Sequence, residues 1–98
     1  METEQGSVNL NPDQYYWFNY PEYRHVSLTI GASGVGTSGS TIEVYVLVPC
    51  EGVKVADGFV NYDNGFSCEF DAKDWTLHVS PDGKSGEYCY NITTTYPH

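Results

Sequence analysis

Apolar and polar residues alternate along much of this chain, in short stretches separated by turn residues. Residues 25–30 place Val26, Leu28 and Ile30 on one face and polar side chains on the other. A period of two is typical of strands with one face in a core. Because apolar residues do not recur at helical spacing over a useful length, the sequence predicts an all-β fold with no long helix.

Turn residues set the expected number of strands. Residues 15–20 form an aromatic run that ends at Pro21, and residues 41–49 form the most regular strand, which has apolar side chains on both faces. We expect that strand to lie centrally in a sheet. The C-terminal half is predicted to form a meander. Its turns are expected at residues 57–58, 63–65, 71–74 and 81–83. This spacing predicts an immunoglobulin-like sandwich or flattened barrel of about seven short antiparallel strands.

The 98 residues have the length of one domain. Residues 1–13 show no periodicity and are expected to form a flexible N-terminal tail, and residues 14–98 are expected to form a single β domain. Residues 31–40 contain four glycines and three serines, a composition that predicts a flexible loop.

The charge balance narrows the choice of partners. Thirteen acidic residues against four basic ones give a formal net charge of −9. Such a surface repels phosphate backbones and anionic lipid headgroups, so we expect no nucleic-acid partner. No run approaches the roughly 20 apolar residues that span a bilayer, so we expect no membrane insertion. The acidic residues are scattered, which favours a role in solubility.

Weak signals bear on localisation. Residues 1–5 lack the basic and apolar regions of a signal peptide, so the protein is either cytoplasmic or a mature fragment with an added methionine. Three cysteines in a short chain and the glycosylation pattern Asn91-Ile92-Thr93 favour a secreted or cell-surface protein.

Residues 77–90 resemble the last hairpin of many immunoglobulin-like sandwiches. There a turn containing glycine, here Pro81-Asp82-Gly83, precedes a strand that carries tyrosine, here Tyr88 and Tyr90. The resemblance covers less than a fifth of the chain and implies the sandwich architecture. The Cys–Trp–Cys spacing of immunoglobulin domains is not reproduced.

The segment Asp63-Asn64-Gly65-Phe66-Ser67-Cys68 is similar to the calcium-binding turn of βγ-crystallin-like domains, with cysteine where serine is usual. The resemblance implies a calcium site. Those domains normally carry two such turns, and the chain has no convincing second copy. An ordinary hairpin turn accounts for the same Asp-Asn-Gly residues.

The chain offers little that predicts metal binding or catalysis. His25, His78 and His98 are dispersed, and no Cys-x-x-Cys or His-x-x-x-His spacing exists. His25 and His78 are expected at exposed outward positions. Cys89 and His78 could share the outer face as nucleophile and base, but that face would be flat and open to water. We therefore predict no metal, no cofactor, no catalytic residues and no enzyme activity.

Aromatic residues between positions 15 and 23 are the best case for a binding site. Tyr15 and Trp17 share one face of the expected strand, and Tyr16, Phe18 and Tyr20 share the other. A set that faces solvent would stack on sugars or anchor a protein. A strand buried on both faces is the alternative. The predicted ligand-binding residues are Tyr15, Tyr16, Trp17, Tyr20 and Tyr23.

Alternate counting places Cys50 and Cys68 inward and Cys89 outward. In a meander the strands of Cys68 and Cys89 would be separated by the strand of Trp75, about 9–10 Å apart, which exceeds the reach of a disulfide. We predict a Cys50–Cys68 disulfide and a free Cys89. A fully reduced cytoplasmic protein is the alternative.

Taken together, these features predict a non-enzymatic binding module of a secreted or surface protein that contacts carbohydrate or protein. One alternative is a stand-alone acidic interaction protein, such as a secreted effector or phage-encoded inhibitor, that blocks a basic site. Another is a structural spacer domain of a fibre or adhesin. The sequence names neither the ligand nor the oligomeric state.

Overall fold

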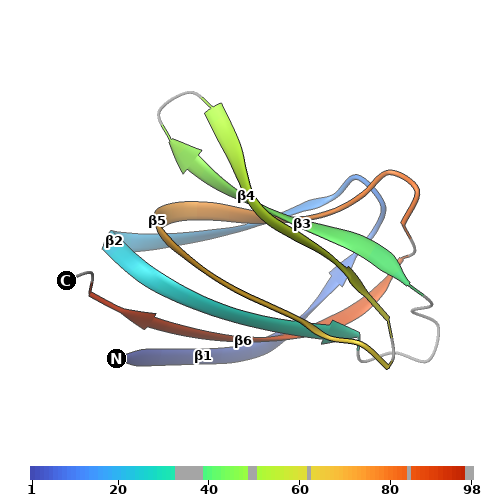
Figure 1. Ribbon diagram of the computed structural model, residues 1–98, viewed down its shortest axis with the longest axis horizontal. Coiled ribbons are helices and arrows are strands. Elements are labelled where there is room, and N and C mark those ends of the chain that lie inside the picture. The colour runs from blue at the N-terminus through green and yellow to red at the C-terminus, as the bar shows by residue number, and fades with distance from the viewer. Residues whose placement is uncertain (33–38, 49–50, 62, 84, 97–98) are drawn as a thin grey trace.

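The computed structural model describes residues 1–32, 39–48, 51–61, 63–83 and 85–96. Six strands form one antiparallel sheet in the order β1-β6-β2-β5-β3-β4 (Figure 1). Their bounds are β1 Glu2–Leu10, β2 Tyr15–Ala32, β3 Ser40–Val48, β4 Glu51–Val60, β5 Phe66–Val79 and β6 Gly86–Thr95. The predicted all-β fold is confirmed.

The sheet folds into two layers because β2 and β5 each run through both. The pairing of β2 with β5 shifts between Asn19 and Arg24, where Pro21 cannot donate to the ladder. Before the shift β2 pairs with β5 alone, and after it β2 pairs with β5 and β6. Figure 1 shows both strands bending at the same end. The β3–β4 layer thus contains β3, β4, residues 15–19 of β2 and residues 74–79 of β5. The β1–β6 layer contains β1, β6 and the remaining parts of β2 and β5.

The core lies between the two layers. Val26, Leu28 and Ile30 are buried, as their alternation predicts. The largest buried side chain is that of Trp75, whose ring stacks on Phe18 with the ring centroids 4.2 Å apart. Burial of apolar surface stabilises the domain, and large aromatic side chains contribute the most buried area per residue.

The strands are fewer and longer than the sequence predicts. Asp57 and Gly58, expected to form a hairpin turn, lie within β4, where they pair with Glu43 and Ile42 of β3. A Cβ atom at Gly58 would lie 2.3 Å from the Phe66 ring, so this glycine permits close packing and not a turn. Residues 71–74, expected to connect two strands, likewise lie within β5.

Residues 2–10, expected to be a flexible tail, form β1 and pair with β6 along their whole length. Val8 and Leu10 of this strand are buried in the core. The sequence signal is weak because the rest of the strand faces solvent. Its partner lies at the other end of the chain, so no local pattern predicts the pairing.

The C-terminal half is not a meander. Strand β2 lies between β5 and β6, and β3 lies between β4 and β5. The interior place expected for residues 41–48 is therefore confirmed, whereas the expected neighbours of the last strand are wrong. Most of the glycine-rich loop, residues 33–38, lies outside the described residues.

Candidate functional site

Aromatic side chains lie around polar residues of β5 on the outer face of the β3–β4 layer. Residues directly opposite each other on neighbouring strands share a face. The register places Thr76 of β5 between Trp17 of β2 and Tyr45 of β3. Tyr15 lies beside them on β2. We call Tyr15, Trp17, Tyr45 and Thr76 the outer platform.

His78 supports one end of the outer platform. Its Nδ1 lies 3.0 Å from Oε1 of Glu43, and its Nε2 lies 3.2 Å from Oδ1 of Asp13. The Tyr15 ring stacks on the imidazole, with centroids 4.2 Å apart and planes inclined by 18°. His78 is therefore only 4% exposed, although the sequence predicts an exposed histidine. It does face outward, but the rings of Tyr15 and Tyr45 cover it.

The turn between β1 and β2 holds Asp13 in place. Gln14 N–H donates to the Asn11 carbonyl at 3.1 Å, and Asp13 N–H donates to the Val79 carbonyl of β5 at 2.9 Å. Asp13 has a φ of 65°, a left-handed conformation that aspartate tolerates better than most residues. The turn thereby fixes a carboxylate against the His78 ring.

Thr76 lies in the middle of the outer platform and is 8% exposed. Within the residues that the structure describes, its Oγ1 has no hydrogen-bond partner. A buried hydroxyl without a partner is unfavourable by about 1–3 kcal/mol, so such groups call for an explanation.

The five predicted ligand-binding residues do not lie together. Tyr15 and Trp17 are 56% and 62% exposed on the outer platform. Tyr16 contacts Phe18 and Tyr90, and the Tyr20 hydroxyl accepts a hydrogen bond from Trp75 Nε1 at 2.9 Å. Burial raises the pKa of Tyr20. Tyr23 is exposed at the register shift of β2.

Sequence reasoning missed Tyr45 and Thr76 as members of a site. The alternation along residues 41–49 placed Tyr45 on the face opposite Ile42, Val44 and Val46, but no local pattern sets it opposite Thr76. That neighbourhood depends on the pairing of β3 with β5, which is a long-range contact.

The outer face of the β1–β6 layer is polar. His25 Nδ1 lies 2.7 Å from Asp71 Oδ1, and the Ser27 hydroxyl donates to Glu69 Oε1 at 2.8 Å. The hydrogen bond to Asp71 raises the pKa of His25, and the hydrogen bond from Ser27 lowers the pKa of Glu69. Such cross-strand pairs are typical of a solvated sheet face.

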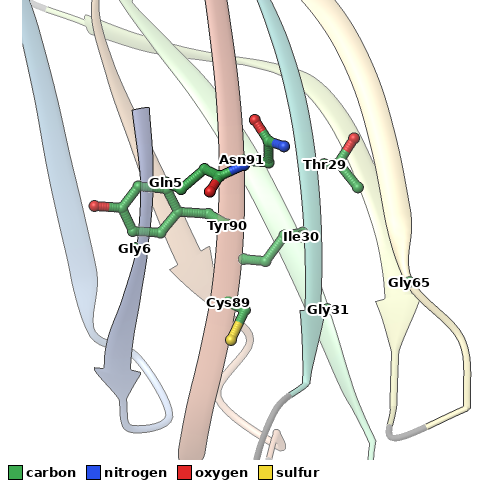
Figure 2. Close-up of a pocket in the computed structure, with 9 residues that line it drawn as sticks. All are labelled: Gln5, Gly6, Thr29, Ile30, Gly31, Gly65, Cys89, Tyr90 and Asn91. Atoms are coloured by element: carbon green, nitrogen blue, oxygen red, sulfur yellow. The ribbon is translucent and has the colours of Figure 1, made fainter. Parts of the chain in front are cut away.

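Cys89 is exposed on β6, beside a shallow surface hollow of about 530 Å³ that spans β1, β6 and β2 (Figure 2). Figure 2 shows the neighbouring Tyr90 reaching across β1 at Gly6. A Cβ atom at Gly6 would lie 2.7 Å from the Tyr90 hydroxyl, so glycine lets this ring lie against the strand.

Among the described residues, neither Cys68 nor Cys89 forms a disulfide. Strand β2 separates them, since Leu28 pairs with Cys68 on one side and with Ile92 on the other. The sequence places the strand of Trp75 between the two thiols, but Trp75 and Cys68 lie on the same strand. Cys50 lies outside the described residues, so the predicted Cys50–Cys68 disulfide stays a prediction.

The two thiols should differ in reactivity. Burial raises the pKa of Cys68 to about 11, and the thiolate is the reactive form. At mildly alkaline pH we expect iodoacetamide to modify Cys89 in the folded protein and Cys68 only after unfolding. Mass spectrometry of tryptic peptides measures both and detects any Cys50–Cys68 bridge. Rapid modification of Cys68 in the folded Cys89→Ser variant would contradict this.

The described residues hold no group of three or more histidine, cysteine, aspartate or glutamate side chains that could hold a metal ion, and His98 lies outside them. In the turn that resembles a calcium site, Asn61 Oδ1 accepts hydrogen bonds from the N–H groups of Asp63 and Asn64 at 2.9 and 2.7 Å. This is the bonding of an ordinary Asx turn. None of the described segments is a helix long and apolar enough to cross a bilayer.

Both ends of the strand order are open. Among the described residues, β1 pairs only with β6, and β4 pairs only with β3. Figure 1 shows the adjoining ends of β3 and β4 projecting beyond the rest of the sheet. Leu47 and Val48 at this end of β3, and Val53 and Val55 on β4, are exposed.

Comparisons with known proteins show a likeness to a solved structure. No protein-family model and no curated protein matches the sequence. Among solved structures, the chain is similar to a protein described by the words "Bacillus endospore appendages form a novel family of disulfide-linked pili". The TM-score is 0.55 and the identity 14%, over 98% of this chain and 88% of the other. The likeness shows a shared fold.

Proposed function

We propose that this protein is a non-enzymatic structural subunit of an extracellular fibre, whose copies join through the open edges of their sheets. The observation that supports this most is that β1 and β4, at the two ends of the strand order, each leave one edge without a partner strand among the described residues. An open edge presents a row of N–H and C=O groups that another strand can bind.

Strand β4 has the features of an edge available for pairing. It is ten residues long, and Val53 and Val55 are exposed on it. Charged side chains often protect such edges. Lys54, however, lies 3.0 Å from Asp57 and 3.6 Å from Glu43, so its charge is partly neutralised within the subunit.

Two different edges also determine what kind of assembly can form. A contact between β1 of one copy and β4 of the next is heterologous, and such contacts continue into open filaments unless rotation closes a ring. The similarity to a protein of disulfide-linked pili supports this proposal, and the exposed Cys89 offers a thiol for a bond between copies. A fibre of this kind would lie at the cell or spore surface.

Replacing Val55 with lysine tests the edge. We expect Val55→Lys to abolish filaments in negative-stain electron micrographs, because a lysine on an edge opposes pairing with a second sheet. The Asn91→Lys control adds the same charge to the exposed face of an interior strand and should leave filaments intact. Both variants should show the circular dichroism of the parent.

Two results would refute the proposal. One is that the parent protein stays monomeric at high concentration under oxidising conditions. The other is that filaments persist in Val55→Lys. Non-reducing gels of Cys89→Ser address the covalent link separately. We expect the covalent dimer to disappear, because one exposed thiol per copy can link only two copies and no other thiol is exposed among the described residues.

A further inference from the structure

We propose that the outer platform is a binding site for a neutral saccharide. The proposal is independent of fibre assembly, since the platform lies on the face of the β3–β4 layer and the assembly contacts lie along sheet edges. Sugars are bound by aromatic rings that contact their C–H faces and by polar groups that bond to their hydroxyls.

Tyr15 supplies a fixed ring face. One side of the ring lies flat on His78, and the residue is 56% exposed. His78 is itself held between Glu43 and Asp13 at 3.0 and 3.2 Å. The ring is thus positioned before any ligand binds, which lowers the entropic cost of binding.

Trp17 supplies a larger ring on the same strand, two residues along. At 62% exposure it is the more exposed of the two tryptophans, since Trp75 is wholly buried. A tryptophan left in water on a sheet face contributes nothing to the core. Exposed aromatic surface of this kind marks interaction sites.

Thr76 supplies a polar group that lacks a partner. Its hydroxyl lies in the row between Trp17 and Tyr45, is buried, and has no hydrogen-bond partner among the described residues. A sugar hydroxyl that enters between the rings can both donate to and accept from a threonine hydroxyl. Binding would then satisfy a group that folding alone leaves unpaired.

The charges at the rim favour a neutral ligand. Each carboxylate there already has a partner: Asp13 and Glu43 contact His78, Asp57 contacts Lys54, and Asp74 accepts a hydrogen bond from Asn19. A basic peptide would have to displace these contacts. The exposed surfaces of Tyr15 and Trp17 and the Thr76 hydroxyl, which lacks a partner among the described residues, match a polyhydroxylated ring without charge.

Tryptophan fluorescence can test this directly. The probes are three neutral oligosaccharides, chitohexaose, cellohexaose and mannohexaose, with poly-lysine as the competing class. We expect at least one saccharide to give a saturable change in emission, because Trp17 is exposed and Trp75 is not. No response to any of the three at millimolar concentration overturns the proposal, as does a response to poly-lysine alone.

Two variants locate the site. Tyr15→Ala should weaken saccharide binding about tenfold or more, as expected for a central aromatic contact. Thr76→Val keeps the shape and removes the hydroxyl, so it should weaken binding several-fold while leaving the melting temperature equal or higher. That combination separates a ligand contact from a structural role. Unchanged binding in both variants would overturn the proposal.

Phe59 provides the matched control. It is an exposed aromatic residue on β4, paired opposite Thr41 and away from the outer platform. Phe59→Ala should leave the saccharide titration unchanged. Equal weakening by Phe59→Ala and Tyr15→Ala would show unspecific adsorption to aromatic surface and would overturn the assignment.

Discussion

Replacing Trp75 with alanine is expected to lower the free energy of unfolding by about 3–5 kcal/mol, the usual range for a buried tryptophan. The side chain is wholly buried, stacks on Phe18 at 4.2 Å and contacts the edge of Phe70 at 5.2 Å. Its Nε1 donates to the Tyr20 hydroxyl at 2.9 Å. The variant loses these contacts, leaves a cavity where the two layers meet, and deprives that hydroxyl of its donor.

Urea denaturation followed by circular dichroism measures this loss. Domains of this size are stable by about 5–15 kcal/mol, so the variant should be marginal. Trp17→Ala is the matched control, because it removes the same side chain from an exposed position on β2. We expect it to change stability by no more than about 0.5 kcal/mol. Similar losses in the two variants would contradict the placement of the core.

Replacing His78 with alanine is expected to be the second most damaging change, at about 2–4 kcal/mol. Hydrogen bonds to charged groups contribute about 1.5–3 kcal/mol each, and Glu43 is largely buried, although Asp13 is well solvated. The variant leaves the Glu43 carboxylate short of a partner. It also removes the ring on which Tyr15 stacks.

Two further variants test whether the loss of stability in His78→Ala comes from its buried contacts. His78→Phe restores a ring under Tyr15 but no hydrogen bond, so it should recover part of the stability and most of the saccharide binding. His25 also contacts two carboxylates, Asp71 and Glu69, but it lies exposed on the β1–β6 layer. His25→Ala should therefore lose much less than His78→Ala, because water screens exposed pairs. Equal losses would show that burial does not strengthen the His78 contacts.

We expect thermal unfolding of the parent protein to be a single transition, because β2 and β5 run through both layers and the layers therefore share one core.

The sequence did not predict the long strands, because they contain residue types that usually end a strand. Pro21, Asp57-Gly58 and residues 71–74 all look like strand ends. In the structure, Pro21 lies in the register shift of β2, Gly58 lies close to the Phe66 ring, and residues 71–74 lie within β5.

The candidate site was predicted in part. Alternation separated Tyr15 and Trp17 from Tyr16 and Tyr20, and the structure confirms that the two sets face opposite sides. Alternation alone could not tell which set faces solvent. Tyr16 and Tyr20 were therefore included in the predicted site, although they contact core residues in the structure. The same parity placed Cys89 outward and Cys68 toward the core, as observed.

The amino-acid sequence by itself determined the all-β class, the two faces of those strands whose residues alternate, and the acidic composition. These properties follow from the two-residue period and from composition, which are local. Only the tertiary structure decided that β1 joins β6, that β2 lies between β5 and β6, and that Thr76 lies between Trp17 and Tyr45. These are pairings between distant segments, and many registers satisfy the same local pattern until the whole core is packed.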